Sequence, residues 1–130
     1  MRMNVVLSYR CCRALLAAAM GCVSLVGCGT KNLPAEPDLA KQSLEAALNS
    51  WKQGEQPAAL DQRTPAITMG DLAWKEGRKL SDYRLLGEAK NDGYNLHYPV
   101  ELTFADAGGA SVEQVDYIVG TSPAITIFRE

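Results

Sequence analysis

His97 is the side chain best suited to acid–base chemistry near neutral pH, and it is the one histidine among 130 residues. It alternates with apolar residues in a segment that also carries Asn95 and Glu101, so these three polar side chains share one face of an expected strand. A histidine oriented by a carboxylate is able to act as a general base. Because this face is the polar one, we interpret His97 as a surface histidine and keep the general base as the alternative.

Other groupings that carry chemistry are missing from the sequence. One histidine and scattered acids do not supply the nitrogen and sulfur ligands of a zinc site. Asn91-Asp92-Gly93 lacks the ligand spacing of a calcium loop and predicts a hairpin turn. The serines lack the Gly-x-Ser-x-Gly setting of a nucleophile. We therefore expect no metal, no cofactor and no catalytic residue.

All four cysteines, Cys11, Cys12, Cys22 and Cys28, lie within the first 28 residues. The remaining 102 residues have none, which excludes a disulfide framework, a cysteine-based metal site and a thiol nucleophile there. A part of the chain without thiols suits an oxidising compartment.

The amino-terminal segment has the composition of a signal peptide. Residues 1–13 contain Arg2, Arg10 and Arg13 and no acid, and residues 14–26 form an apolar run of 13. Such a run suits the hydrophobic region of a signal peptide and is too short to span a bilayer comfortably.

This run ends in Leu25-Val26-Gly27-Cys28, which resembles the lipobox of bacterial lipoproteins. The resemblance implies diacylglycerol on the Cys28 sulfur, cleavage before Cys28 and acylation of the new amino terminus by a fatty acid such as palmitate. One acyl chain anchors weakly, at about 0.8 kcal/mol per buried CH₂, so stable attachment needs two or more. The alternative is an ordinary secretory signal cut after Ala19.

Three parts of the chain follow from this interpretation: a signal peptide at 1–27, a lipidated tether at 28–37 and one small domain at 38–130. We expect the protein in the cell envelope, facing the periplasm or the exterior. Gly29 is not the aspartate that signals inner-membrane retention, which favours the outer membrane where the cell has one.

Charge is divided unequally along the chain. Three of the 13 basic residues and none of the 15 acidic ones precede residue 28, so residues 28–130 carry ten basic against fifteen acidic residues, a net charge of −5. An acidic domain has no footprint for nucleic acid and is not drawn to anionic lipid by charge. Attachment to a membrane must therefore come from the lipid on Cys28.

Apolar periodicity predicts one long helix followed by strands. From Asp38 to Gln53 the apolar residues recur at helical spacing and form one stripe. A short turn of helix is expected at 57–62, a brief extended piece at 66–69 and a helical turn capped by Asp71. From Leu80 the period changes to two, and strands are expected at 80–90, 95–104, 114–119 and 124–128.

Short connections between these four strands predict an antiparallel meander. Its apolar face needs a cover, and the helix supplies the matching stripe. We therefore expect an α+β fold, with one long N-terminal helix packed on a curved four-stranded antiparallel sheet. Pro99 removes a ladder hydrogen bond from an inner strand, so we expect a bulge or bend there.

This layout resembles the cystatin and nuclear-transport-factor-like (SnoaL-like) class, over about 90 residues and without a shared motif. The resemblance implies a pocket between helix and sheet, which aromatic residues such as Trp51 and Trp74 are able to line. Core packing is the simpler explanation of those aromatic residues. Fold likeness alone does not carry a function.

Leu86, Ile118 and Phe128 are apolar residues on the sheet face opposite the expected core. An exposed apolar patch there would mark a surface for a protein partner or a homodimer. We therefore expect a non-catalytic, lipid-tethered interaction domain rather than an enzyme. The alternative is a SnoaL-like enzyme or ligand carrier, with His97, Glu101 or Asp82 near the pocket.

Overall fold

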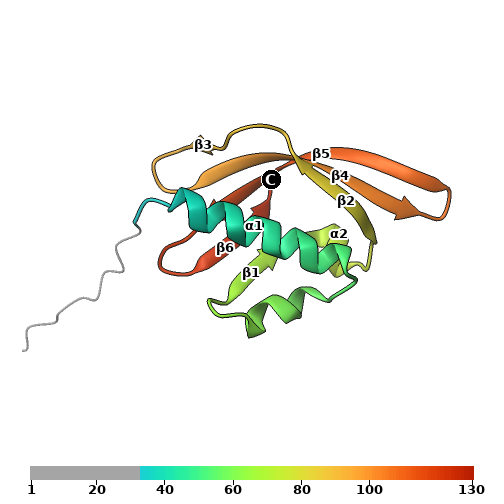
Figure 1. Ribbon diagram of the computed structural model, residues 1–130, viewed down its shortest axis with the longest axis horizontal. Coiled ribbons are helices and arrows are strands. Elements are labelled where there is room, and N and C mark those ends of the chain that lie inside the picture. Colours follow the sequence, from blue (N-terminus) through green and yellow to red (C-terminus); the bar gives the residue numbers. More distant parts are fainter. Residues whose placement is uncertain (1–32) are drawn as a thin grey trace, which may run out of the picture.

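The computed structural model describes residues 33–130 and has an α+β fold, so the expected class is confirmed (Figure 1). The predicted signal peptide at 1–27 and the predicted lipidation site Cys28 lie outside the described residues. In chain order the elements are α1 (Pro37–Lys52), the 3-10 helix η1 (Pro57–Gln62), β1 (Ile67–Gly70), α2 (Leu72–Lys75), β2 (Leu80–Leu85), β3 (Lys90–Asn91), β4 (Leu96–Asp106), β5 (Gly109–Gly120) and β6 (Ile125–Arg129).

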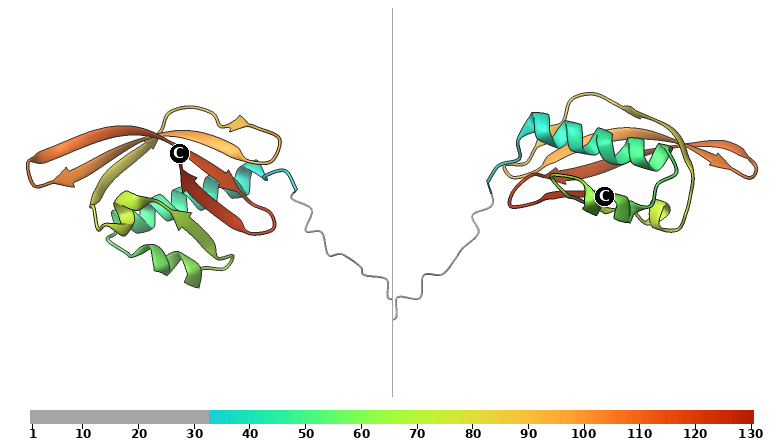
Figure 2. Two further views of the ribbon diagram at one scale, coloured as in Figure 1. Left: turned by 180° about the vertical axis from the view of Figure 1, so that it is seen from behind. Right: turned by 60° about the horizontal axis from the view of Figure 1, so that its bottom comes forward.

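Helix α1 lies across one side of the sheet (Figures 1 and 2). Pro37 suits the first turn, where its missing N–H costs no helical hydrogen bond. After the helix, Gly54 adopts a φ of 83°, a conformation that favours glycine. The buried stripe faces the sheet and contains the apolar positions of the periodic pattern: Ala40, Leu44, Ala47, Leu48 and Trp51.

The sheet differs from the expected four-stranded meander. It has six strands and is mixed, in the order β1-β6-β5-β4-β2, with β3 also pairing with β4. The four-stranded, purely antiparallel prediction is therefore wrong. β4, β5 and β6 do follow one another antiparallel, but β1 adds to β6 in parallel, with Ile67 opposite Ile125.

The β1–β6 pairing escaped the sequence analysis because β1 has only four residues and its partner lies at the other end of the chain. Its side chains alternate, with Ile67 and Met69 buried toward α1 and Thr68 exposed. By pairing with β6, β1 removes what would otherwise be an open edge beside the core.

Of the bulge or bend that we expected at Pro99, the bulge is absent. Pro99 pairs with Asp116 in an unbroken β4–β5 register. Its carbonyl accepts from Leu86 N at 2.8 Å, so its backbone faces the other edge of β4. There β2 ends at Leu85 and β3 begins at Lys90, and the missing N–H falls at the gap between them. One continuous strand over 80–90 was therefore also a wrong prediction.

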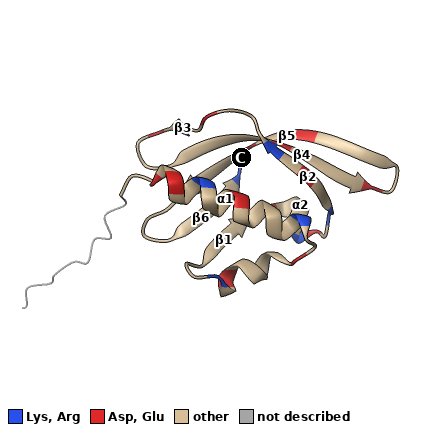
Figure 3. Ribbon diagram, in the orientation of Figure 1, with Lys and Arg blue, Asp and Glu red and all other residues tan. Residues whose placement is uncertain are grey.

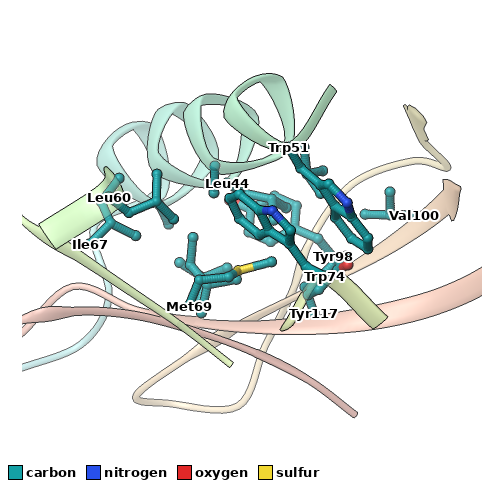
Figure 4. Close-up of a cluster of buried hydrophobic side chains, with 14 of the residues drawn as sticks. Leu44, Trp51, Leu60, Ile67, Met69, Trp74, Tyr98, Val100 and Tyr117 are labelled. Carbon is teal, nitrogen blue, oxygen red and sulfur yellow. The ribbon is translucent and has the colours of Figure 1, made fainter. Parts of the chain in front are cut away.

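The core lies between α1 and the inner face of the sheet (Figure 4). Trp51 of α1 and Trp74 of α2 stack with ring centroids 5.4 Å apart and planes 6° from parallel. Each indole N–H has a backbone acceptor, Trp51 on Arg78 O at 2.7 Å and Trp74 on Glu55 O at 2.8 Å. The two tryptophans thus join α1, α2 and the loops beside them, as core packing predicts.

Candidate functional site

The sheet face turned away from α1, called the outer face below, carries one row of side chains that crosses five strands. Strand register places Gly70, Phe128, Ile118, His97 and Lys90 side by side in this order. Neighbours in such a row lie close enough for their side chains to touch. In this row the glycine is followed by an apolar pair, Phe128 and Ile118, and the row ends with two basic groups, His97 and Lys90.

The Phe128 ring rests on the bare backbone of Gly70, and Phe128 still keeps 48% of its surface exposed. A Cβ added at Gly70 would lie 2.8 Å from Phe128 Cε1, closer than real Cβ atoms approach. The glycine therefore lets the ring lie flat along β1 instead of standing away from the sheet. Ile118, on the other side, is half-buried.

Leu86 lies on the same face but apart from that pair. Continuing the β2–β4 register by one residue from Leu85 and Val100 places Leu86 opposite Pro99, in the next row. Two strand spacings, roughly 10 Å, separate it from β5. Of the three predicted partner-surface residues, the structure brings Ile118 and Phe128 together and sets Leu86 apart.

His97 occupies the middle of the outer face, between the apolar pair and Leu86. Its Nε2 lies 2.9 Å from Asp92 Oδ2, and its Nδ1 lies 3.8 Å from Glu130 Oε2. The hydrogen bond to Asp92 is the largest of the influences that raise the pKa of His97 above its ordinary value. A shallow hollow of about 240 Å³ opens beside it, lined by Lys90, His97, Pro99, Asp116 and Glu130.

The Asn91–Asn95 turn holds the carboxylate that meets His97. Gly93 N donates to Asn91 Oδ1 at 2.7 Å, and Tyr94 N and Asn95 N donate to Asp92 Oδ1 at 2.9 and 2.7 Å. The hydrogen bonds from Asn95 N, from His97 and from Tyr94 N lower the pKa of Asp92 well below its ordinary value. The turn that the sequence predicted is confirmed, and Asp92 is the partner of His97 that the sequence analysis missed.

The other acids named with His97 lie elsewhere. Glu101 pairs with Arg84 on the neighbouring strand at 3.3 Å. Asp82 pairs with Lys52 of α1 at 3.3 Å. The structure therefore does not assemble His97, Glu101 and Asp82 around one pocket.

A second polar cluster is buried at the end of β1, and nothing in the sequence analysis pointed to it as a unit. Asp71, 1% exposed, accepts from Tyr117 Oη at 2.6 Å and from Trp74 N at 3.3 Å, and Arg129 Nη1 lies 3.7 Å away. Burial and the adjacent Asp71 carboxylate raise the pKa of Tyr117, so its hydroxyl stays protonated and donates.

Arginines extend this cluster toward the surface. Arg129 and Arg78 both contact Glu113 Oε2, at 3.2 and 2.9 Å, and Arg78 also binds Asp106 at 3.0 Å. The Arg78 guanidinium lies 3.7 Å from the centre of the Phe104 ring. Within residues 33–130 no buried side-chain polar atom lacks a partner, so this cluster is a closed, satisfied network.

Two further hollows lie where the ends of α1 meet neighbouring loops. One, of about 570 Å³, separates the start of α1 from the β2–β3 connection and has Leu85, Ala89 and Tyr98 in its wall. The other, of about 360 Å³, lies at the end of α1 beside Trp51, Trp74 and Arg78. Both are hollows at the rim of the helix–sheet boundary, where the resemblance to SnoaL-like proteins implied a pocket.

Charge and ligand geometry add no further site in the described part of the chain. Basic and acidic positions are interspersed along α1 and spread over the sheet (Figure 3). Residues 33–130 contain no cluster of three or more potential metal ligands. Among these same residues, no helix has both the length and the apolar character needed to cross a bilayer.

Comparison of the chain with family models, with curated proteins and with solved structures returned no match.

Proposed function

We propose that this chain is a lipid-anchored protein of the cell envelope whose domain is a non-catalytic binding module. The sequence Leu25-Val26-Gly27-Cys28 carries the anchoring part of the proposal, because a basic region, an apolar run and a cleavage tetrapeptide occur in the right order. The lipid on Cys28 attaches an acidic domain that charge alone would not hold at a membrane.

The binding part of the proposal rests on one observation, the adjacent apolar side chains of exposed Phe128 and half-buried Ile118 on the outer face. Gly70 has no side chain at the place where the Phe128 ring rests, and Phe128 still exposes 48% of its surface. A contiguous apolar patch exposed on an ordered sheet face is typical of a partner surface. The first partner to test is a second copy of this chain, because a sheet face can pair with itself about a twofold axis.

A non-catalytic role agrees with how the polar groups are used. Glu101 and Asp82 are each paired with a cation, so neither joins His97 and Asp92 in one catalytic group. The buried carboxylate of Asp71 is fully engaged by Tyr117, Trp74 and Arg129. Glu101, Asp82 and Asp71 therefore stabilise the fold through these pairs. The feature of the outer face that favours binding is its apolar surface.

Mass spectrometry of the amino-terminal peptide tests the anchor. The expected product begins at Cys28 and carries the mass of diacylglycerol and a further acyl group. Cys28→Ala should remain unprocessed and unlipidated. A native product that starts at another residue and leaves the membrane in detergent-free buffer would contradict the anchoring proposal.

A photo-crosslinking residue placed at position 118 in the full-length lipoprotein tests the outer face. The expected product has twice the mass of the protein, and Phe128→Arg should abolish it by placing a charge in the contact. Leu72→Arg is the matched control, since Leu72 is 68% exposed on α2 and lies off the sheet. If no crosslinked species forms, or if both arginine variants act alike, the outer face is not a partner surface.

The second candidate is a ligand carrier of the SnoaL-like type, favoured by the hollow of about 570 Å³ beside the start of α1. Its wall is mostly apolar, with Leu85, Ala89 and Tyr98, and Asp38 and Lys41 stand at its rim. Such a lining suits an amphiphile with an apolar body. A rise in the thermal midpoint with added long-chain amphiphiles, lost in Ala89→Trp, would support a carrier, and no rise would exclude it.

A further inference from the structure

The chain enters the domain at one fixed end. Ala35 N donates to Tyr94 O at 2.8 Å, and Glu36 N donates to Thr121 Oγ1 at 2.9 Å. Ala35 itself is buried. These bonds join residues 33–36 to the Asn91–Asn95 turn and to the connection at 121–124. We call these three segments together the anchor-side end. The β4–β5 hairpin points to the opposite end of the molecule (Figures 1 and 2).

Two of the most exposed large apolar side chains in the described part of the chain lie at the anchor-side end. Leu33 is 60% exposed and Tyr94 is 62% exposed. The hydrogen bond between Ala35 and Tyr94 keeps the two side chains in one region. Neither is needed by the core, which leaves both free to contact something outside the domain.

The short distance along the chain to Cys28 limits what Leu33 and Tyr94 can contact outside the domain. Four residues lie between Cys28 and Leu33, and the five Cα-to-Cα steps from one to the other span at most about 18 Å when fully extended. A lipid on Cys28 therefore keeps Leu33 and Tyr94 near the bilayer. The 11 residues of β4 rise about 35 Å along the strand and carry the β4–β5 hairpin away from this end.

We infer that the anchor-side end is a membrane-contact surface, with Leu33 and Tyr94 entering the headgroup region of the bilayer. This inference rests on the proposed lipidation of Cys28. Tyrosine suits the position, since its ring is apolar and its hydroxyl remains hydrated at a membrane interface. The domain then stands with β4 and β5 directed away from the lipid, which leaves the outer face open to partners at the side.

The contact is apolar rather than electrostatic. Glu36 and Asp92 lie at the anchor-side end, and residues 28–130 carry a net charge of −5. Anionic lipid would therefore not strengthen the contact, and zwitterionic lipid is sufficient.

The absence of cysteine after Cys28 makes this orientation measurable in the full-length lipoprotein, because one introduced cysteine can be labelled alone. Ala124→Cys places a fluorophore in the β5–β6 connection at the anchor-side end and leaves Tyr94 intact. Ala107→Cys places the same fluorophore at the β4–β5 hairpin. Both proteins are reconstituted into phosphatidylcholine vesicles that contain headgroup-nitroxide lipid, which quenches nearby fluorophores.

Strong quenching is expected at position 124 and little at position 107. Adding Leu33→Ser and Tyr94→Ser to the Ala124→Cys protein should lower the ratio of docked to free domain roughly tenfold, equivalent to a loss of about 1.4 kcal/mol. The matched control carries Leu72→Ser and Val112→Ser, which remove two other exposed apolar side chains and should leave quenching unchanged. Equal thermal midpoints establish that both double variants are folded.

Each remaining outcome is decisive. Equal quenching at positions 124 and 107, or no effect of the Leu33 and Tyr94 changes, overturns the membrane-contact surface while the amino-terminal mass still supports the anchor. If the amino-terminal peptide carries no lipid, the anchor and this surface both fall.

Discussion

Asp71 and Asp92 use the same local motif in opposite surroundings. Each carboxylate accepts from backbone N–H groups two or three residues further on, Asp71 from Trp74 and Asp92 from Tyr94 and Asn95. Asp71 is 1% exposed, whereas the Asp92 side chain is 41% exposed. Asp71 contacts side chains from the distant strands β5 and β6, whereas every partner of Asp92 lies within five residues of it in the chain.

A turn motif therefore predicts which local hydrogen bonds form, but not how much they contribute to the free energy of unfolding. A buried carboxylate loses its hydration and depends on every partner that replaces water. An exposed carboxylate recovers water when a partner is removed. The same residue type in the same motif should therefore respond very differently to substitution.

Asp71→Ala is expected to have the largest effect. It removes the carboxylate that accepts from Tyr117 Oη and Trp74 N, and it leaves Arg129 without one of its carboxylate partners. The free energy of unfolding should therefore fall by about 3–5 kcal/mol. Urea unfolding followed by the fluorescence of Trp51 and Trp74 measures this directly. Asp92→Ala is the control and should change the midpoint far less. Similar effects of the two changes would remove the distinction between the clusters.

Tyr117→Phe should have the next largest effect. It keeps the buried ring and deletes only the hydroxyl that donates to Asp71, which should cost about 1.5–3 kcal/mol because the acceptor is charged. Tyr94→Phe removes an exposed hydroxyl and should leave the same urea midpoint unchanged. A Tyr117→Phe protein as stable as the native one would mean that Arg129 and Trp74 N alone satisfy Asp71.

Gly70→Ala extends the comparison to the outer face and should cost about 1 kcal/mol. The new Cβ would lie 2.8 Å from Phe128 Cε1, so the ring must swing toward solvent. Gly108→Ala is the matched control, since nothing lies within 4 Å of a Cβ there. The outer-face crosslink should weaken in Gly70→Ala only. An unchanged crosslink and midpoint would show that the ring does not depend on Gly70.

The His97–Asp92 pair should give the smallest effect and a distinct pH dependence. As the one histidine of the chain, His97 titrates alone in an NMR spectrum, and its pKa should lie above 6.5. Asp92→Asn should bring that pKa back toward 6.5, whereas Glu101→Gln, on the same face but paired with Arg84, should not. Equal shifts in the two variants would mean that the general charge of the face, not Asp92, holds the proton.

The sign of the linked stability follows from the two pKa directions. The raised pKa of His97 makes its contribution fully present below pH 6.5 and lost as the pH rises through the folded value. The lowered pKa of Asp92 makes its contribution present above pH 3.8 and lost as the pH falls. The difference in stability between native protein and Asp92→Asn should therefore be greatest between pH 3.8 and 6.5, and a difference that grows above this range would contradict the pair.

Local patterns in the sequence were sufficient for features that depend on neighbours in the chain. The apolar stripe of α1, the cap at Asp71, the turn at Asn91-Asp92-Gly93 and the polar side of His97 all follow from spacing over a few residues. The apolar character of Ile118 and Phe128 was equally visible, but their adjacency required the β5–β6 register.

Only the tertiary structure decided which distant residues meet. The parallel β1–β6 pair, the seat of Phe128 on Gly70 and the bond from Tyr117 to Asp71 each join segments 46 or more residues apart. These contacts form because several elements pack around one core at the same time. The sequence of a single segment does not specify which distant segment it will contact. The sequence by itself determined the basic and apolar composition of residues 1–27, the absence of cysteine after Cys28 and the periodicity of the elements that follow, because those properties are local to the chain.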